Sequence, residues 1–512
     1  MTASGFVQGT ERAAFTPRGA NFVRLAATPG GGHYHSTFEP GAYDATAAKQ
    51  ALGAMKHDGY NLVRVFIDPG TFTAPFHGNS ASVESREPVR AEYMDNVAKF
   101  VKEAGAQGIY VLPSLDYIPA NTYYYAIAGS PKGNIDGDNT KYLDKDYVKA
   151  KAEYMAQFAK ALIARVGPQY KNAVLAYASD NEAFFDGSKA PYATMSGTVT
   201  TLDGKTYDMS KPADRQQSAD ANLVAYTHQM KQALKSVDSD LLLTMGFFTN
   251  GAVGKPGFDG LTVHCSHSCN PNVDYRVPGR PLMVAKHGAL DFVDLHLYPR
   301  SRGYDLAADM QTMEGGRFDK PLLIGEMGAL KSIYGNDITA AAYAMRDLQV
   351  ATCAYAAKGW AFWTWDTTED LAEQRRFYNL RDNSGAINGQ LAPIVRFDPC
   401  KKEPTSPPPA PTASPTSPPT ATATATPTGT PTASPTTAPT TAPTESSTGS
   451  PEASSSAPVI PKPNDQSGPP LADTGGSSRL PLLLGVGITL ALLGAAGAVF
   501  MQMRRKKLQI AG

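Results

Sequence analysis

Two glutamates in the sequence lie at the end of short apolar runs and could act together as a pair of carboxylic acids. Glu182 ends the run VLAYASDNE, and Glu326 lies in PLLIGEMG. Cleavage of a glycosidic bond needs one carboxylic acid that protonates the leaving oxygen and a second carboxylate that attacks the sugar or activates water. A single glutamate at a strand end is more often a salt-bridge partner, so the prediction rests on the pair. We predict that Glu182 and Glu326 are the two catalytic carboxylic acids of one site.

Other polar and aromatic residues end neighbouring runs of the same kind. Charged and polar groups can hydrogen-bond sugar hydroxyls, and an aromatic ring can lie against the apolar face of a pyranose. His296 and Trp363 each have an alternative role, as a satisfied core residue and as core packing. We predict that the following residues bind the substrate: Arg64, Asp116, Asn181, His296, Tyr298 and Trp363.

The elements that must position these residues are strands that alternate with helices. Eight runs rich in β-branched and aromatic residues begin near Gly19, Asn61, Gly108, Val174, Leu241, Asp291, Pro321 and Gly359. Segments with helical periodicity lie between them, at residues 44–58, 90–106, 146–166, 217–236 and 338–358. Eight such units predict an α/β fold of the (β/α)8 TIM-barrel type, in which the carboxyl ends of all strands face one cleft. A doubly wound open sheet is disfavoured because no glycine-rich phosphate loop follows the first strand.

Two long segments follow the third and fourth predicted strands, at residues 117–143 and 183–214. They contain several aromatic residues, among them Tyr124 and Phe185. Loops of this length on the catalytic face of a barrel usually shape access to the site.

This pattern resembles the cellulase-type barrels of glycoside hydrolase family 5 and its wider clan A. In that clan an asparagine precedes the acid/base glutamate on the fourth strand, as Asn181 precedes Glu182, and the nucleophile ends the seventh strand, as Glu326 does. Arg64, the His-x-Tyr of the sixth strand and Trp363 match as well. The sequence departs from the family at two places. Asp116 stands where a sugar-binding histidine is usual, and Ala183 stands where a proline usually follows the glutamate.

The resemblance implies a retaining β-glycoside hydrolase that works by double displacement, without a cofactor or a metal ion. The substrate would be an extracellular β-linked glycan of the β-glucan or β-mannan type. We expect Arg64 and the hydroxyl of Tyr298 to lower the pKa of Glu326. Glu182 should lie near Glu326 and be partly withdrawn from water, and Asn181 should hydrogen-bond the sugar 2-hydroxyl. The alternative from another class is a catalytically silent barrel that binds glycans as an adhesin, which would not need both glutamates.

The charge balance of the chain limits the classes of molecule that it is expected to bind. Lys plus Arg equals Asp plus Glu, 47 each, so no overall field favours nucleic acid, and a neutral partner fits better. We expect a monomer.

The cysteines Cys265, Cys269, Cys353 and Cys400 allow one or two disulfides. His264 and His267 lie beside these first two cysteines, so a metal site is an alternative to a loop disulfide there.

The predicted barrel covers residues 1–400, and the sequence that follows it differs in composition. Residues 401–470 are mostly Pro, Thr, Ser and Ala and predict a disordered linker. Residues 480–503 form an uncharged apolar stretch long enough for a transmembrane helix. The basic residues in 504–512 should remain cytoplasmic, which places the barrel outside the cell.

Between the linker and the apolar stretch lies LADTG, residues 471–475. Together with the stretch and the basic end, it resembles the LAxTG form of the sortase cell-wall sorting signal. That resemblance implies cleavage between Thr474 and Gly475, with sortase and peptidoglycan as partners. The protein would be a membrane-inserted precursor and then a cell-surface, wall-anchored protein. Since the first residues show neither a basic nor an apolar signal region, we expect the given start to lie downstream of the true one.

Overall fold

The fold is known from a computed structural model that describes residues 5–9, 11–27, 33–70, 78–79, 85–130, 134–369 and 375–401. Within these residues the main sheet has nine parallel-paired strands in the order β12-β8-β7-β6-β3-β17-β16-β15-β13. The strands are β3 (Arg18–Asn21), β6 (Leu62–Ile67), β7 (Tyr110–Leu115), β8 (Tyr177–Ala178), β12 (Leu243–Thr244), β13 (Gly246–Phe248), β15 (Val293–Leu297), β16 (Leu322–Met327) and β17 (Ala357–Phe362).

The sheet closes into a barrel through one interrupted strand. β12 pairs with β8 and β13 pairs with β15, and only Met245 separates the two pieces. Backbone hydrogen bonds continue across the interruption, since the amide of Gly246 donates to Asp180 at 3.1 Å and Ala183 donates to Gly246 at 2.9 Å. The described residues therefore contain the eight predicted strand positions, and the predicted TIM-barrel fold is confirmed.

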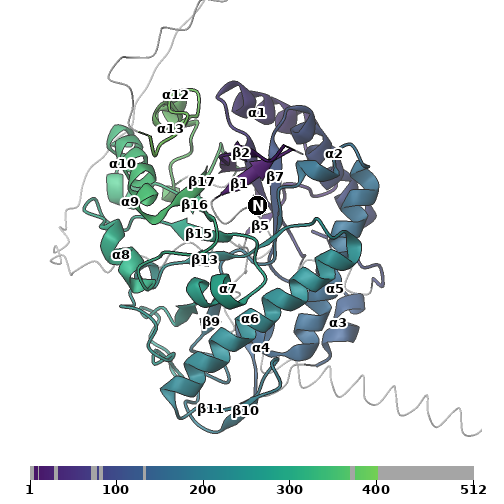
Figure 1. Cartoon of the computed structure of the whole chain (residues 1–512), viewed down its shortest axis with the longest axis vertical. Helices are drawn as coiled ribbons and strands as arrows, with labels where there is room; N and C mark the ends of the chain where they lie inside the picture. The colour runs from purple at the N-terminus through teal and green to yellow at the C-terminus, as the bar shows by residue number, and fades with distance from the viewer. Residues whose placement is uncertain are drawn as a thin grey trace, which may run out of the picture. The chain divides into compact units, whose positions relative to one another are not determined.

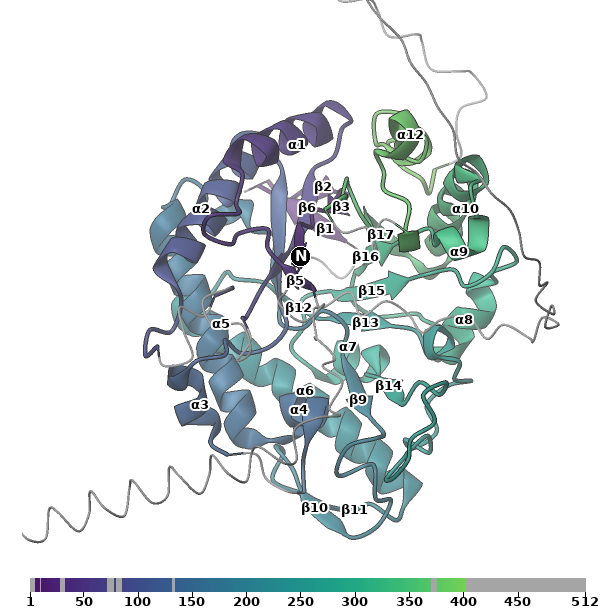
Figure 2. The same ribbon diagram turned by 180° about the vertical axis from the view of Figure 1, so that it is seen from behind.

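The helices lie outside the strands, as Figures 1 and 2 show from opposite sides. Aspartates cap several of them, since the side chains of Asp44, Asp144, Asp305 and Asp337 accept hydrogen bonds from backbone amides of the first turn. The longer helices are α1 (Ala45–His57), α2 (Ala91–Ala106), α5 (Lys145–Val166), α6 (Pro212–Val237), α7 (Pro281–His287), α8 (Leu306–Thr312) and α10 (Ile338–Ala351).

One predicted helix is wrong at its end. The helix expected at residues 338–358 stops at Ala351, and a short 3-10 helix, η4 (Thr352–Tyr355), follows it. Ala356 then adopts a left-handed conformation with φ of 59°, which turns the chain into β17. The alanine-rich sequence has a helical pattern, but the last residues of that pattern belong to the barrel strand.

The two long segments on the carboxyl side of the barrel have structure of their own. The first holds α3 (Thr122–Ala128), η1 (Gly137–Asn139) and α4 (Thr140–Leu143). In the second, β9 (Phe184–Asp186) pairs with β14 (Arg276–Pro278), and β10 (Thr198–Thr200) pairs with β11 (Thr206–Asp208). Tyr124 and Phe185 are buried in the main hydrophobic core, so these two aromatic residues hold the segments in place. The remaining short elements are β4 (Leu25–Ala27), β5 (His33–His35), η2 (Lys171–Ala173), η3 (Gly251–Val253), α9 (Lys331–Tyr334), α12 (Asp382–Gly385) and α13 (Asn388–Leu391).

A hairpin closes the amino end of the barrel. β1 (Phe6–Gln8) pairs with β2 (Ala13–Phe15), and the rings of Phe6 and Phe15 join a buried cluster. The other members of that cluster lie in or next to the barrel strands, several of them at the strand beginnings, and include Leu62, Leu112, Phe292 and Leu323. Burial of these side chains seals the end of the barrel that lies opposite the predicted site.

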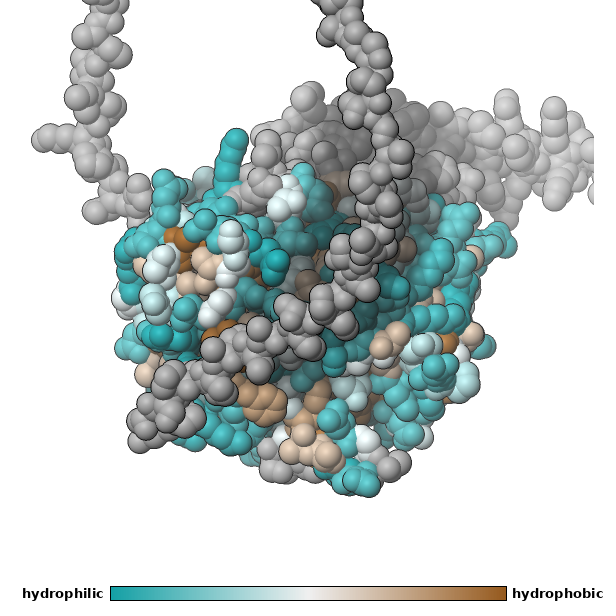
Figure 3. All heavy atoms as spheres, turned by 90° about the horizontal axis from the view of Figure 1, so that it is seen from above, coloured by the Kyte–Doolittle hydropathy of each residue, from teal (hydrophilic) through white to brown (hydrophobic). Residues whose placement is uncertain are grey.

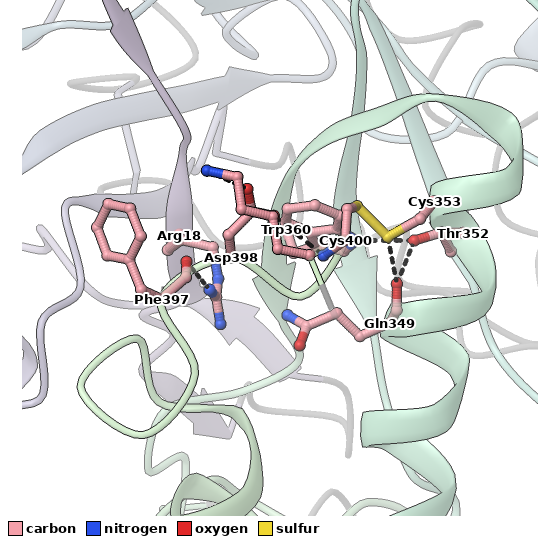
Figure 4. The surroundings of a disulfide bond; sticks show 9 residues. Arg18, Gln349, Thr352, Cys353, Trp360, Phe397, Asp398 and Cys400 are labelled. Atoms are coloured by element: carbon pink, nitrogen blue, oxygen red, sulfur yellow. Dashed lines mark hydrogen bonds and ion pairs between the residues drawn. A yellow bond between two sulfur atoms is a disulfide. The ribbon is translucent and has the colours of Figure 1, made fainter. Parts of the chain in front are cut away.

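Hydrogen bonds and a disulfide hold the last described residues against the amino end of the barrel (Figure 4). Arg18, the first residue of β3, is buried and donates hydrogen bonds to the carbonyls of Leu391, Arg396 and Phe397 at 2.6 to 2.8 Å. A disulfide joins Cys353 to Cys400.

A second disulfide joins Cys265 to Cys269, so the structure favours the loop disulfide over the metal site with His264 and His267.

The described surface seen from above in Figure 3 is mostly hydrophilic, with apolar residues in small patches. Within the described ranges, no helix combines the length and the apolar character needed to cross a bilayer. The predicted linker beyond Lys401, the LADTG motif, the transmembrane stretch and the basic end all lie outside those ranges.

Candidate active site

Glu326 lies near the carboxyl end of β16 and is completely buried. Its Oε1 accepts a hydrogen bond from Nη1 of Arg64 at 2.5 Å, and its Oε2 accepts one from the hydroxyl of Tyr298 at 2.5 Å. These contacts connect β16 with β6 and with the residue that follows β15. Both carboxylate oxygens are thus held by donors, one of them a cation, which fixes the side chain in a single orientation.

Arg64 connects the strands on its side of the barrel. Its guanidinium donates to Asn21 Oδ1 at 3.0 Å and to Asn181 Oδ1 at 2.7 Å, and a longer contact of 3.4 Å reaches Ser114. A buried arginine is tolerated only where its donors find partners. The arginine therefore organises residues from β3, β7 and the segment after β8 around the predicted nucleophile.

Glu182 follows β8 by four residues and has only 6 % of its surface exposed. The turn brings its Oε1 to 3.0 Å from Nδ1 of His296, which is itself 3.7 Å from Oε2 of Glu326. The imidazole therefore lies between the two predicted catalytic carboxylates. An oxygen of Glu182 lies within 4.8 Å of an oxygen of Glu326. The two glutamates that the sequence analysis paired are thus close together in the barrel.

The surroundings of His296 favour its protonated form. Burial alone would lower the pKa of the imidazole, but the carboxylates of Glu326, Asp294 and Glu182 more than offset it and raise the pKa to about 9. Near neutral pH the ring is then a cation with a proton on each nitrogen, and its Nδ1 donates to Glu182.

The expected pKa direction for Glu326 is wrong. Arg64 and the hydroxyl of Tyr298 do act to lower its pKa, as predicted, and so does His296. Burial is the larger effect, however, and raises the pKa of Glu326 above the ordinary carboxyl value, with a further upward contribution from Glu182. Sequence alone named the neighbours of this glutamate but did not show how completely the barrel withdraws it from water.

Glu182, His296 and Glu326 each place one possible metal-ligand atom within 4.8 Å of the others. The protein itself already engages these atoms, because His296 bonds Glu182 while Arg64 and Tyr298 occupy both oxygens of Glu326. A metal cation would also lie beside the buried guanidinium, which would repel it. The arrangement therefore suits proton transfer and nucleophilic attack better than metal binding.

Asp116, predicted to bind substrate, follows β7 and is half-buried. Its carboxylate pairs with Nζ of Lys141 at 2.6 Å, and the same ammonium lies 3.1 Å from Asp180, the residue before Asn181. Burial alone would raise the pKa of Asp116, but Lys141 and hydrogen bonding hold it below the ordinary value. Asp116 thus belongs to a charged group that underlies the Asn181–Glu182 turn, and its contact with a sugar remains a prediction.

Trp363, predicted as the sugar platform, lies just after β17 and is only 2 % exposed. It packs edge-on against Phe66, with ring centroids 5.7 Å apart, and its cluster also contains Tyr298 and Phe377. The tryptophan therefore borders the site beside the tyrosine that holds Glu326. Its role as a platform remains a prediction.

Sequence reasoning missed three residues of the site: Asn21, Ser114 and Asp294. Asn21 accepts from Arg64 and donates to the carbonyl of Gly325 at 3.0 Å. Asp294 could have been found, because Asp294, His296 and Tyr298 alternate along DFVDLHLYP and so share one face of the strand. Asn21 and Ser114 lie in their runs without such a signal.

No protein-family model and no curated protein matches the sequence. Among solved structures, an exo-β-1,4-mannosidase from Opitutaceae bacterium strain TAV5 is similar with a TM-score of 0.48 and 15% identity. The match covers 78% of this chain and 62% of the mannosidase, so this chain spans less than two thirds of that protein. An endo-1,4-β-mannanase from Rhizomucor miehei has a TM-score of 0.48 and 14% identity, over 77% of this chain and 98% of the mannanase.

A third similar structure is an endo-β-1,4-mannanase from Thermotoga petrophila, with a TM-score of 0.47 and 15% identity. Its match covers 76% of this chain and 78% of that enzyme. Values this low assign neither a family nor an activity to the chain. Its function has to be inferred from the chemistry of its own site.

Proposed function

We propose that the chain is a retaining β-glycoside hydrolase in which Glu326 is the nucleophile and Glu182 the acid/base. The observation that carries the proposal is the buried pair itself. The carboxylate of Glu326 accepts hydrogen bonds from a guanidinium and a hydroxyl, and the carboxylate of Glu182 is hydrogen-bonded to His296. One oxygen of Glu182 lies within 4.8 Å of one oxygen of Glu326. So close an approach fits the carboxyl separation of about 5 to 5.5 Å typical of retaining enzymes better than the about 6.5 to 9.5 Å of inverting ones.

In the first step, an oxygen of Glu326 attacks the anomeric carbon while Glu182 gives its proton to the glycosidic oxygen, and the carbon–oxygen bond to the leaving sugar breaks. A glycosyl ester on Glu326 results. In the second step, Glu182 takes a proton from water, which attacks the same carbon and releases Glu326 as a carboxylate. Net retention of configuration follows because the carbon is inverted twice.

The neighbours of the two glutamates have distinct roles in this scheme. Arg64 and Tyr298 hold Glu326 with its oxygens aligned for attack, and their donors compensate its negative charge when the ester is hydrolysed. His296 bonds one oxygen of Glu182 and leaves the other for the glycosidic oxygen. Asn181 is fixed by Arg64 through its Oδ1. In the proposal, its amide nitrogen hydrogen-bonds the 2-hydroxyl of the sugar.

The substrate in this proposal is a neutral β-linked glycan of the β-glucan or β-mannan type. A chain with equal numbers of acidic and basic residues has no overall field that would select a charged polymer.

Variants of the two glutamates test the proposal on both natural glycans and aryl glycosides. Glu326→Ala should abolish turnover of every substrate. Glu182→Ala should hydrolyse ordinary glycans very slowly but still react with dinitrophenyl glycosides, whose leaving group needs no proton, and should accumulate the glycosyl-enzyme. Glu92→Ala is a matched control, because Glu92 lies on the exposed side of α2. Wild-type turnover in both Glu182→Ala and Glu326→Ala would refute the site, and a wild-type protein that binds glycans without turnover would favour the adhesin.

We also propose that the protein is displayed on the cell surface through its C-terminal sorting signal. The support is the sequence LADTG, followed by an apolar stretch and a basic end. Thr474→Ala should move the protein from the covalent wall fraction to the membrane fraction, while Thr444→Ala in the linker should not. Unchanged wall linkage of Thr474→Ala would contradict the sortase assignment.

A further inference from the structure

Asp294 lies on β15, two residues before His296, and its side chain is completely buried. One carboxylate oxygen is 3.7 Å from Nε of Arg64, and the other is 3.7 Å from Nε2 of His296. Neither oxygen makes a direct hydrogen bond within the part of the chain that the structure describes. A buried carboxylate is costly unless cations surround it, so its place between two cationic side chains calls for an explanation.

The neighbouring strand is shaped around this carboxylate. β15 and β16 pair in register from Val293 to Leu295, and the register then shifts so that His296 faces Glu326. Gly325 is the extra residue of that bulge, and a Cβ placed on it would meet Oδ1 of Asp294 at 1.9 Å. The bulge therefore makes room for the aspartate and, in the same step, brings Glu326 opposite His296.

In the form of the site in which Glu182 is protonated, ready to act as the acid, the charges balance only when Asp294 is counted. A protonated His296 and Arg64 carry two positive charges, and Glu326 supplies one negative charge when Glu182 holds its proton. Asp294 supplies the second. Among the described residues, the charged groups that the imidazole meets directly are Glu182, Asp294 and Glu326. Arg64 pairs with Asp294 and Glu326, and Tyr298 donates to Glu326.

We propose that Asp294 is a positioning residue of this site, whose carboxylate holds Arg64 and His296 in register with the two glutamates and balances their positive charge. It acts through those two cations. The inference rests on the proposed function, since the positions it controls are those of the acid/base and the nucleophile. It adds to that function a third buried carboxylate that takes no part in bond making.

The test compares the full-length wild-type protein with Asp294→Asn, which keeps the shape of the side chain and removes its charge. Exchange of the imidazole C2 hydrogen, followed by mass spectrometry across a pH series, reports the pKa of each histidine separately. In Asp294→Asn we expect the pKa of His296 to fall from about 9 toward the ordinary imidazole value, because a nearby negative charge has been removed. The other histidines should exchange equally in both proteins. Asp309→Asn is a matched control, because Asp309 is a buried carboxylate bonded to Thr249 and Tyr304.

Activity gives the second readout. Removal of one negative charge disfavours every protonated form nearby, so both limbs of the pH–activity profile of Asp294→Asn should move to lower pH. A merely structural role would lower kcat without moving the profile. An unchanged pKa of His296 and an unmoved profile in Asp294→Asn would overturn the inference. If Asp294→Asn fails to fold, the wild-type protein still tests the inference. A His296 pKa at or below the ordinary imidazole value in the wild type would overturn it. Histidine exchange does not depend on turnover, so an inactive wild-type protein would refute the proposed function alone.

Discussion

Arg64 and Glu326 meet inside the barrel with Nη1 and Oε1 2.5 Å apart, and neither side chain reaches solvent. Each lies on a strand separated from the other by β3 and β17. A buried charge that loses its partner keeps its full desolvation cost, so this pair ties the stability of the barrel to the integrity of the site.

Arg64→Leu should therefore destabilise the protein by about 3 to 5 kcal/mol. The substitution removes the arginine that pairs with both Glu326 and Asp294 and leaves their buried carboxylates without that partner. Urea denaturation measures the change. The control is Arg302→Leu, because Arg302 is exposed and its ion pair with Asp337 is 3.8 Å long, so the change should stay below about 1 kcal/mol. Equal effects of the two substitutions would contradict the role given to Arg64.

His296 predicts a specific pH dependence of stability. Its folded-state pKa of about 9 lies above the unfolded value near 6.5, so its contribution is fully present below the unfolded value and is lost as pH rises through the folded one. Between pH 6 and pH 10 the stability difference between wild type and His296→Gln should shrink by an amount on the order of 3 kcal/mol. A difference that stays constant across this range would show that the imidazole is not held as a cation.

The barrel was predictable because each strand run and each helical run recurs with its own period, and helices such as α1, α2 and α5 begin and end within a residue or so of expectation. The closeness of the two glutamates was predictable because each lies near the end of a run. The burial of Glu326 was not, because the pKa of a group depends on what surrounds it in three dimensions. β8 is only two residues long, and Glu182 reaches the site from the turn that follows it, which no strand period predicts.

The two disulfides should differ in their contribution to stability. The Cys353–Cys400 bond closes a separation of 47 residues and the Cys265–Cys269 bond one of 4. Loop-closure entropy predicts losses of about 4 and about 2 kcal/mol when each pair is changed to serine. Calorimetry or urea denaturation measures both. A larger loss from the short loop than from the long one would contradict this order.

The contacts that the last described residues make at the amino end of the barrel predict that the folded unit ends near Lys401. A chain that stops after Lys401 keeps Cys400 and the carbonyls that accept from Arg18, so it should melt at the temperature of the full-length protein and keep its activity. A chain that stops after Leu391 loses the carbonyls of Arg396 and Phe397 and the disulfide, and should melt at a clearly lower temperature. Equal melting temperatures for the two chains would show that these last residues do not stabilise the barrel.

The configuration of the first sugar product tests the central claim most directly. Proton NMR recorded during the first turnovers of a β-linked glycan or aryl β-glycoside distinguishes the two anomers before they interconvert. If Glu326 forms a glycosyl ester that Glu182 then helps to hydrolyse, the β-anomer should appear first, as expected for oxygens within 4.8 Å. The α-anomer as first product would require a water between the two carboxylates and would contradict the retaining mechanism.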